Sequence, residues 1–236
     1  MNIIVVEDHH FIKNDTIRLS GRHFEHVTKI LNTQVGSELS IGRLNGNLGK
    51  AKLQIIGSDF LELTIVELDT PPPPTLPVSL ILGLPRPRML QRTLQTIATM
   101  GVKHLHLIQS GRVEKSFWQT PLLRSESIHE QLLIGLEQGK ATQLPSVTFH
   151  TRFRPFIEDH PLINHSPALK LIAHPGDYPK AYSVDKCTTL LAIGPEGGFL
   201  NKEVEQFQLR GFKTIQLGER ILRVETAIPV LLAKLF

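Results

Sequence analysis

The residues best suited to chemistry lie in two short glycine-containing segments near the C-terminus. The first is Gly194-Pro195-Glu196-Gly197-Gly198, and the second runs from Leu217 to Thr226 and carries arginines and carboxylates. Closely spaced glycines permit positive φ and let the backbone approach a ligand. Each segment follows a strand-like run, and ligands of open α/β sheets bind beyond the carboxyl ends of strands. Spacing alone leaves open a ligand site or an ordinary pair of turns.

The hydrophobic pattern predicts the elements around these segments. Residues 189–193 form an unbroken apolar run, which is typical of a buried parallel strand. A polar helix is expected over 201–210, followed by a short strand over 213–217. If Thr226 caps the terminal helix, Pro229 falls in its first turn, where a missing N–H costs little.

The two segments together resemble the signature of the RsmE family. The matching residues are Ile193 to Gly198 and Leu217-Gly218-Glu219-Arg220-Ile221-Leu222-Arg223-Val224-Glu225-Thr226-Ala227. RsmE proteins are bacterial methyltransferases of the SPOUT superfamily that methylate N3 of a uridine in 16S ribosomal RNA. The resemblance implies an α/β fold, with a SPOUT-type trefoil-knot domain preceded by a small PUA-like β-barrel. It also implies S-adenosylmethionine (SAM) as cofactor in the knot, ribosomal RNA of the small subunit as partner, and a homodimer.

The resemblance further implies roles for single residues. Arg223, next to SAM, would stabilise negative charge on the base. Glu225 is the nearest candidate base, although an acid is also favoured at a helix N-terminus by the helix dipole. Glu196 is expected to fix its loop, and Arg220 could pair with Glu196 or touch RNA. The expected cofactor-binding residues are His174, Pro175, Ile193, Gly194, Pro195, Glu196, Gly197, Gly198, Leu217, Gly218, Arg220, Ile221, Leu222 and Arg223.

The composition is that of a globular, slightly basic protein. The 236 residues are 41% hydrophobic and 20% charged, with a net charge of +4. One or two domains are expected. No apolar run approaches the roughly 20 residues of a membrane span. Cys187 is the single cysteine, so no internal disulfide can form and a cytoplasmic location is expected.

Basic residues are concentrated between Leu82 and Arg124. This stretch contains seven basic residues and one acid, Glu114, which gives a local charge of +6. Such a patch suits contacts with RNA phosphates, and a solvated basic face is the alternative. The candidate RNA-binding residues are Arg86, Arg88, Arg92, Arg112 and Lys115 in this stretch and Lys29 nearer the N-terminus.

The run Pro71-Pro72-Pro73-Pro74 marks the expected domain boundary, because consecutive prolines favour a stiff spacer. Residues 1–70 contain strand patterns at hairpin spacing and one helix over 23–32 capped by Ser20, and they are assigned to the PUA-like, RNA-binding barrel. Residues 71–76 form the linker, and 77–236 the methyltransferase domain with its C-terminal knot. There, alternating strands and helices predict a mostly parallel sheet. A helix is expected over 121–139, and an irregular connection with one short strand over 145–167.

Other chemistries find little support. His129-Glu130 lacks the second histidine of a zinc-binding HExxH helix. His104 and His106 share a strand face, but no cysteine or acid lies within sequence reach, so no metal is expected. The sequence contains no Walker loop, no GxGxxG and no nucleophile elbow.

Several positions depart from the family pattern. Asn32 stands in place of an arginine, Thr96 and Thr99 replace a lysine and a glutamate, and Lys140 lies where an arginine is lost or moved. The start, Met1-Asn2, also lacks the arginine that commonly precedes the first strand. Two alternatives therefore stay open: methylation of a different RNA, and a non-catalytic RNA- or ribosome-binding protein on the same fold.

Overall fold

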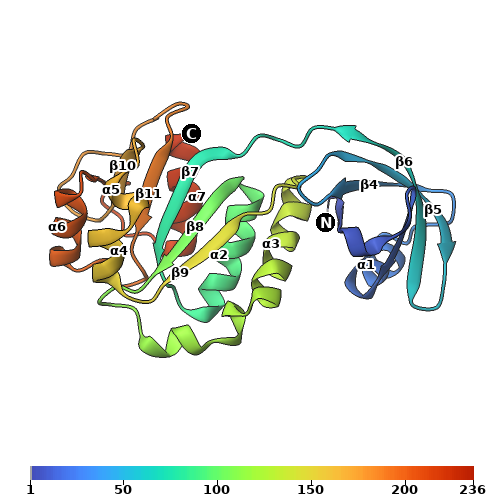
Figure 1. The fold of residues 1–236 in the computed structure, drawn as a ribbon, viewed down its shortest axis with the longest axis horizontal. Coiled ribbons are helices and arrows are strands. Elements are labelled where there is room, and N and C mark those ends of the chain that lie inside the picture. The colour runs from blue at the N-terminus through green and yellow to red at the C-terminus, as the bar shows by residue number, and fades with distance from the viewer. Residues whose placement is uncertain (1) are drawn as a thin grey trace. The chain divides into compact units, whose positions relative to one another are not determined.

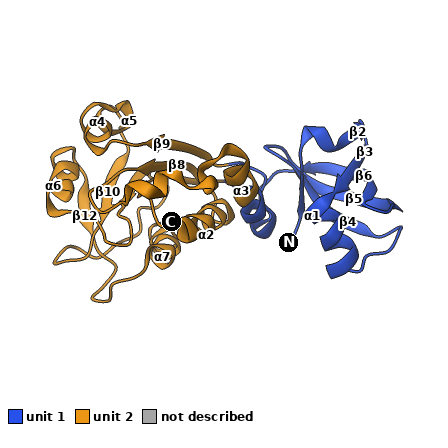
Figure 2. Ribbon diagram, turned by 90° about the horizontal axis from the view of Figure 1, so that it is seen from below, with its two compact units in different colours: residues 1–74, 133–144 blue, residues 75–132, 145–236 orange. Residues whose placement is uncertain are grey.

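The structure is a computed structural model that describes residues 2–236, so Met1 lies outside the described residues. The chain divides into two compact units (Figure 2). The first unit comprises the chain up to Pro74 together with residues 133–144, and the second comprises 75–132 and 145–236. The chain therefore leaves and re-enters each unit.

The first unit is built on a six-stranded sheet with the order β1-β4-β5-β6-β3-β2. β1 and β4 are parallel, and the other pairs are antiparallel. Alternate side chains such as Ile17, Leu19, Leu61 and Leu63 are fully buried, which gives the sheet one apolar face. The strands are β1 (Ile4–Val6), β2 (Phe11–Lys13), β3 (Thr16–Ser20), β4 (Glu38–Arg43), β5 (Leu48–Ile56) and β6 (Phe60–Thr70).

A helix between β3 and β4 covers part of this unit. α1 (Gly21–Glu25) continues as a π-helical turn over His26–Ile30, so the helix begins and ends two residues before the predicted bounds of 23–32. Ser20 is its N-cap residue as predicted, although its side chain makes no capping hydrogen bond.

The predicted methyltransferase domain of 77–236 differs from the observed division. The end of α3 (Ser125–Gly139) belongs to the first unit, because the Glu137 carbonyl accepts the N–H groups of Asn2 and Ile3. The Thr142 carbonyl accepts the N–H of Asn45 in the same way. No local pattern in the sequence predicts such backbone hydrogen bonds between distant segments.

The second unit contains a six-stranded, fully parallel sheet with the order β12-β10-β11-β7-β8-β9. This arrangement confirms the predicted α/β class. The chain runs outward from β7 to β9 and then returns to the other side of β7. The strands are β7 (Leu76–Gly83), β8 (Val102–Ile108), β9 (Ser146–His150), β10 (Leu169–Ala173), β11 (Thr189–Ile193) and β12 (Lys213–Ile215).

Helices cover both faces of this sheet (Figure 1), with α4, α5 and α6 on one side and α2 and α7 on the other. Two predictions for this region were wrong. The helix expected over 121–139 begins at Ser125 after two 3₁₀ turns, η3 (Lys115–Gln119) and η4 (Pro121–Leu123). The segment 145–167 holds two helices besides β9. The helix bounds are α2 (Pro87–Thr99), α4 (Phe153–Asp159), α5 (Pro161–Asn164), α6 (Asn201–Leu209) and α7 (Val224–Leu235).

The terminal helix α7 starts earlier than expected. Arg223, not Thr226, is its N-cap residue, and the Arg223 carbonyl accepts the N–H groups of Thr226 and Ala227 at 3.0 and 2.8 Å. Pro229 therefore lies inside the helix rather than in its first turn. An interior proline leaves the carbonyl of the residue four positions earlier, Glu225, without its helical donor.

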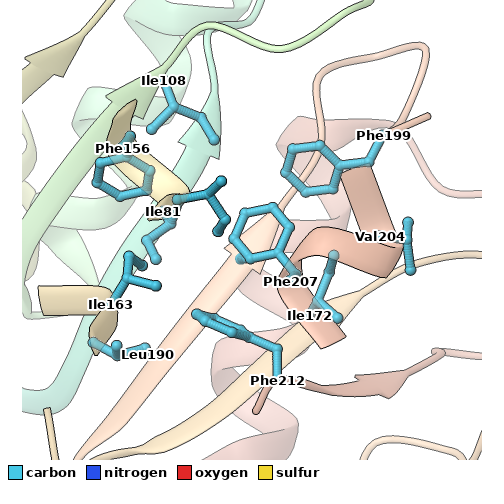
Figure 3. Packing of buried hydrophobic residues seen from close by; sticks show 12 residues of the cluster. Ile81, Ile108, Phe156, Ile163, Ile172, Leu190, Phe199, Val204, Phe207 and Phe212 are labelled. Atoms are coloured by element: carbon cyan, nitrogen blue, oxygen red, sulfur yellow. The ribbon is translucent and has the colours of Figure 1, made fainter. Parts of the chain in front are cut away.

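The core on one face of the parallel sheet is aromatic. The Phe207 ring packs against Phe199 and Phe212, with centroids 5.1 and 4.9 Å apart, beside Leu190 and Ile172 of the central strands (Figure 3). All five residues of β11 are buried, because alternate side chains enter the cores on opposite faces. Within residues 2–236, no helix is both long enough and apolar enough to cross a membrane.

Candidate functional site

A pocket of about 360 Å³ lies at the carboxyl ends of β10, β11 and β12. Parallel α/β sheets place ligands at the carboxyl ends of their strands. The pocket is lined by Arg112, Ala173, His174, Pro175, Ile193, Gly194, Pro195, Glu196, Gly197, Gly198, Gln216, Leu217, Gly218, Arg220, Ile221, Leu222, Val224, Ala227 and Leu231.

The structure brings together nearly all of the predicted cofactor-binding residues. Each of them lines this pocket except Arg223, whose chain neighbours Leu222 and Val224 both do. Six lining residues are absent from the predicted cofactor-binding set: Arg112, Ala173, Gln216, Val224, Ala227 and Leu231. Gln216 directly precedes the second motif, so its position could have suggested it.

The first glycine segment folds into a tight turn. A Cβ atom on Gly194 would lie 2.7 Å from the backbone nitrogen of Phe199 and 2.9 Å from Cα of Gly198. Gly198 has a φ of +72°, and its N–H donates to the carbonyl of Pro195 at 2.7 Å. The close backbone approach at Gly194 and the left-handed conformation at Gly198 are therefore why this segment needs glycine.

The carboxylate of Glu196 joins two loops at the pocket. Its Oε1 accepts the backbone N–H of Arg86 at 3.0 Å, which joins the loop after β11 to the loop after β7. A contact of this kind is what the predicted loop-fixing role of Glu196 requires.

A second carboxylate, missed in the sequence, fixes the loop after β8. Glu203 is buried at the start of α6, and its Oε1 accepts the N–H of Gly111 at 2.7 Å. Its Oε2 accepts the N–H of Leu200 at 2.8 Å. Two backbone donors therefore satisfy this buried charge, and the start of α6 is held to the loop after β8.

Arg112 lies in the pocket, although it was predicted only as an RNA-binding residue. Its guanidinium Nη1 donates to the carbonyl of Gly197. Burial, and secondarily the charge of Arg112, lowers the pKa of His174 below its ordinary value, so the neutral imidazole is favoured.

Two buried polar atoms of the lining lack a hydrogen-bond partner among residues 2–236. They are Nδ1 of His174 and Oε1 of Gln216. Buried polar groups are normally paired, so each such atom calls for an explanation. A polar ligand bound in the pocket would supply the missing partners, while Ile193, Leu217 and Ile221 supply apolar walls.

Neither of the two residues predicted to be catalytic lines the pocket, although Leu222 and Val224, which flank Arg223, do. Arg223 is exposed at the N-terminus of α7. Glu225 lies in the first turn of that helix, as the alternative helix-dipole interpretation predicts, and its Oε2 is buried without a partner among the described residues.

The remaining predicted RNA-binding residues are exposed. Arg86, Arg88, Arg92 and Lys115 belong to the second unit, on the loop after β7, on α2 and on η3. Lys29 belongs to the first unit, where its Nζ lies 3.1 Å from Oε1 of Glu25 one helical turn away.

The histidines of β8 find partners on the neighbouring strand. Nδ1 of His104 lies 2.8 Å from Oγ of Ser146, and Nδ1 of His106 lies 2.7 Å from Oγ1 of Thr148 and 3.2 Å from Nε2 of His150. In the part of the chain that the structure describes, no three His, Cys, Asp or Glu side chains are grouped to hold a metal ion.

Comparison with known proteins gives consistent matches. An RNA methyltransferase domain family matches residues 71–235. Ribosomal RNA small subunit methyltransferase E of Treponema pallidum is 30% identical, and the match covers 96% of this chain and 87% of that protein.

Two solved structures share the fold over nearly the whole chain. One is a putative methyltransferase from Legionella pneumophila in complex with the bound cofactor SAM, with a TM-score of 0.77, 21% identity, and coverage of 99% and 96% of the two chains. The other is a ribosomal RNA small subunit methyltransferase E from Neisseria gonorrhoeae bound to SAM, with a TM-score of 0.75, 22% identity, and coverage of 98% and 94%.

Proposed function

This chain belongs to the RsmE family of ribosomal RNA methyltransferases, and we propose that it transfers the methyl group of SAM to N3 of a uridine in 16S ribosomal RNA of the small subunit. The observation that carries the proposal is the pocket at the carboxyl ends of β10 to β12. It combines the two family motifs with apolar walls and with two buried polar atoms that have no hydrogen-bond partner among the described residues.

The residues of the pocket fit SAM chemically. The cofactor carries amino groups that donate hydrogen bonds, and Oε1 of Gln216 is a buried acceptor without a donor. Ile193, Leu217 and Ile221 suit the adenine and ribose. The close approach at Gly194 leaves backbone groups, rather than side chains, to line the adjoining wall.

The acceptor uridine carries a proton on N3 at neutral pH, so the enzyme has to remove it. When bound, SAM supplies an activated methyl group on a sulfonium. As the N3–methyl bond forms, the sulfur–methyl bond breaks, and the N3 proton leaves. In the proposal, Glu225 receives this proton at Oε2, which is buried and without a partner among the described residues. Arg223 stabilises the negative charge that develops on the base.

The position of Arg223 next to the pocket supports its role in this proposal. An exposed guanidinium between two pocket-lining residues can meet a base that enters from solvent. A delocalised, permanently charged donor is well suited to an anionic carbonyl group of uridine.

The proposal also includes three features that the RsmE resemblance implies. The segment that carries both motifs forms the trefoil knot, the protein acts as a homodimer, and the first unit is a PUA-like module that holds RNA. A ribosomal substrate also places the protein in the cytoplasm.

Two measurements on one preparation test the proposed function. SAM affinity is measured by calorimetry, and transfer of labelled methyl is measured with small ribosomal subunits that lack uridine-N3 methylation. The parent protein is expected to bind SAM and label the subunits. Arg223→Ala is expected to bind SAM but to lose about 100-fold or more in transfer rate, as for a lost charge-stabilising donor. Failure of the parent protein to bind SAM would overturn the proposal.

A further inference from the structure

We propose that Trp118 and Phe149 form a stacking platform for an unpaired base of the RNA substrate, with Lys115 placed to bind a neighbouring phosphate. This inference rests on the proposed RNA substrate. It assigns a surface outside the SAM pocket to two aromatic residues for which neither the motifs nor the predicted basic contacts gave a role, together with Lys115, which is already a candidate RNA-binding residue.

The two rings form a partly exposed aromatic pair. Their centroids are 6.3 Å apart and their planes are at 90°, in an edge-to-face arrangement. Phe149 is 44% exposed on β9, which is the last strand at one edge of the sheet. Nucleobases stack on the faces of solvent-accessible aromatic side chains, and this exposure makes the Phe149 side chain accessible to a base.

A hydrogen-bond chain fixes the orientation of Trp118. Its indole Nε1 donates to Oε1 of Gln109 at 2.6 Å. Nε2 of Gln109 in turn donates to the carbonyls of Ser110 and Val113 at 2.7 and 3.0 Å. Because the indole N–H already has an acceptor, Trp118 needs no further polar partner. The hydrogen bond also fixes the orientation of the ring. A pre-oriented ring also loses little rotamer freedom when a ligand binds.

Lys115 lies on the same side of its helical turn as Trp118. Both belong to η3, a 3₁₀ helix, in which side chains three residues apart are aligned. Lys115 is exposed, and Lys103 and Arg124 are exposed basic residues of the same unit. Glu114, which precedes η3, is the one acid in the stretch from Leu82 to Arg124.

The charge of this region favours RNA over a protein partner. A local charge of +6 between Leu82 and Arg124 attracts a polyanion and opposes a second copy of the same surface. Aromatic rings next to cations are the usual means by which proteins bind single-stranded RNA, because every base has a face on which to stack.

The loop after β8 connects the Trp118–Phe149 platform to the pocket. The loop that carries Gln109 continues to Gly111, which binds Glu203, and to Arg112, which binds the carbonyl of Gly197. Along the chain, fewer than ten residues therefore separate Gln109, which orients Trp118, from Arg112, which lines the pocket. A base stacked on Trp118 would lie beside the loop that shapes the pocket, which suits a nucleotide that flanks the target.

The single tryptophan provides a direct readout. Fluorescence of Trp118 is followed while an oligouridylate of about ten nucleotides is added, within the usual site size for single strands. Saturable quenching is expected. Phe149→Leu, which keeps apolar volume but removes the ring, is expected to weaken binding at least about fivefold, and Phe149→Tyr to retain it. Lys115→Ala is expected to weaken binding and to reduce its salt dependence.

Tyr182→Ala is the matched control, because Tyr182 is an aromatic residue of the same unit with 45% exposure. It is expected to bind RNA like the parent protein. Circular dichroism checks the fold of each variant, and if Phe149→Leu fails to fold, Lys115→Ala carries the test.

Methyl transfer on the same preparations separates this inference from the proposed function. Quenching without methyl transfer would support the platform while the proposed function fails. Methyl transfer with no quenching, or with equal RNA affinity for Phe149→Leu and the parent protein, would overturn the platform. A change of emission on dilution of the protein alone would also overturn it, because the rings would then be covered by a second copy.

Discussion

Arg112 is the cation whose position connects the basic stretch to the pocket. Its guanidinium donates to the carbonyl of Gly197, and charge-assisted hydrogen bonds of this kind contribute about 1.5–3 kcal/mol. Arg112→Ala is therefore expected to weaken SAM binding by about tenfold, as measured by calorimetry. Arg124→Ala, which removes an exposed arginine of the same unit, is the control. Unchanged SAM affinity in Arg112→Ala, with weaker RNA binding, would mean that Arg112 acts on RNA alone.

Gly194 and Gly197 offer a matched pair of substitutions in one loop. A Cβ at Gly194 meets backbone atoms at 2.7 to 2.9 Å, whereas a Cβ at Gly197 meets the flexible Arg112 side chain at 3.0 Å. Gly194→Ala is expected to abolish measurable SAM binding, because the turn has to open. Gly197→Ala is expected to weaken binding only several-fold. Equal affinities in a calorimetric titration would contradict this account of the loop.

Two of the departures from the family pattern lie at left-handed backbone positions, and at one of them, Asn32, the residue type suits the backbone. Asn32 and Lys140 have φ values of +47° and +51°, in the left-handed region. Asn tolerates this conformation better than most residues. Lys140 follows α3, where the N–H of Ala141 closes the helix on the carbonyl of Leu136 at 3.0 Å. Nothing in the structure explains Thr96.

At the scale of elements, Glu203 joins the start of α6 to the loop after β8. Glu203→Gln keeps the shape of the side chain but replaces one of the two acceptor oxygens by an NH₂ group, which cannot accept a hydrogen bond. One buried donor is then left unpaired, which destabilises by about 1–3 kcal/mol. A lower melting temperature and a raised KM for SAM are expected. Glu205→Gln, at an exposed position of the same helix, should behave like the parent protein. If both variants keep parental values, the Glu203 contacts have no role in shaping the site.

The elements of the second unit were largely predictable because most carry strong periodicity. β11 (Thr189–Ile193) and α6 (Asn201–Leu209) begin and end within one residue of the predicted ranges 189–193 and 201–210. α4 and α5 were missed because histidines and prolines interrupt their apolar pattern. The start of α7 was misplaced because Pro229 argued for a first-turn position, whereas the helix accommodates it in its interior.

The site was predictable only where it is contiguous in sequence. Both glycine motifs meet in one pocket as expected. Arg112 and Glu203 were missed as pocket-forming residues because their partners lie 85 and 92 residues away along the chain. Such contacts depend on the order of strands in the sheet, which local patterns do not specify.

At the scale of the whole molecule, a buried charge cluster holds residues 133–144 to the first unit. Glu137 is 1% exposed and lies 2.8 Å from Nε2 of His23, and Arg22 donates two hydrogen bonds to its carboxylate. Although burial alone would raise it, the hydrogen bonds from His23 and Arg22 lower the pKa of Glu137 below its ordinary value.

Glu137→Gln is expected to reduce the free energy of unfolding by about 3 kcal/mol, because it leaves Arg22 without its buried partner. Glu130→Gln, on the exposed face of the same helix, is the control. Because the folded pKa is depressed, the contribution of Glu137 is present above its ordinary pKa and is lost as the pH falls through the folded value. Urea titrations at several pH values measure both effects, and equal stability of the two variants would contradict the role of this cluster.

The histidine cluster of the second unit predicts a separate loss of stability in acid. Burial, followed by the charges of His150 and His160, lowers the pKa of His106 to about 4, from an unfolded value near 6.5. The unfolded chain therefore binds a proton that the folded protein does not between these pH values. Stability is expected to fall as the pH drops from about 6.5 to 4. His106→Gln should flatten this part of the profile in thermal melts, and an unchanged slope would contradict the assignment.

The most direct test of the central claim is to map the base that receives labelled methyl when the protein acts on small ribosomal subunits lacking uridine-N3 methylation. Gly194→Ala serves as the inactive control. We predict label at N3 of one uridine in 16S ribosomal RNA, and none with Gly194→Ala. Label on another base or another RNA, or no label from protein that binds both SAM and the subunits, would contradict this prediction.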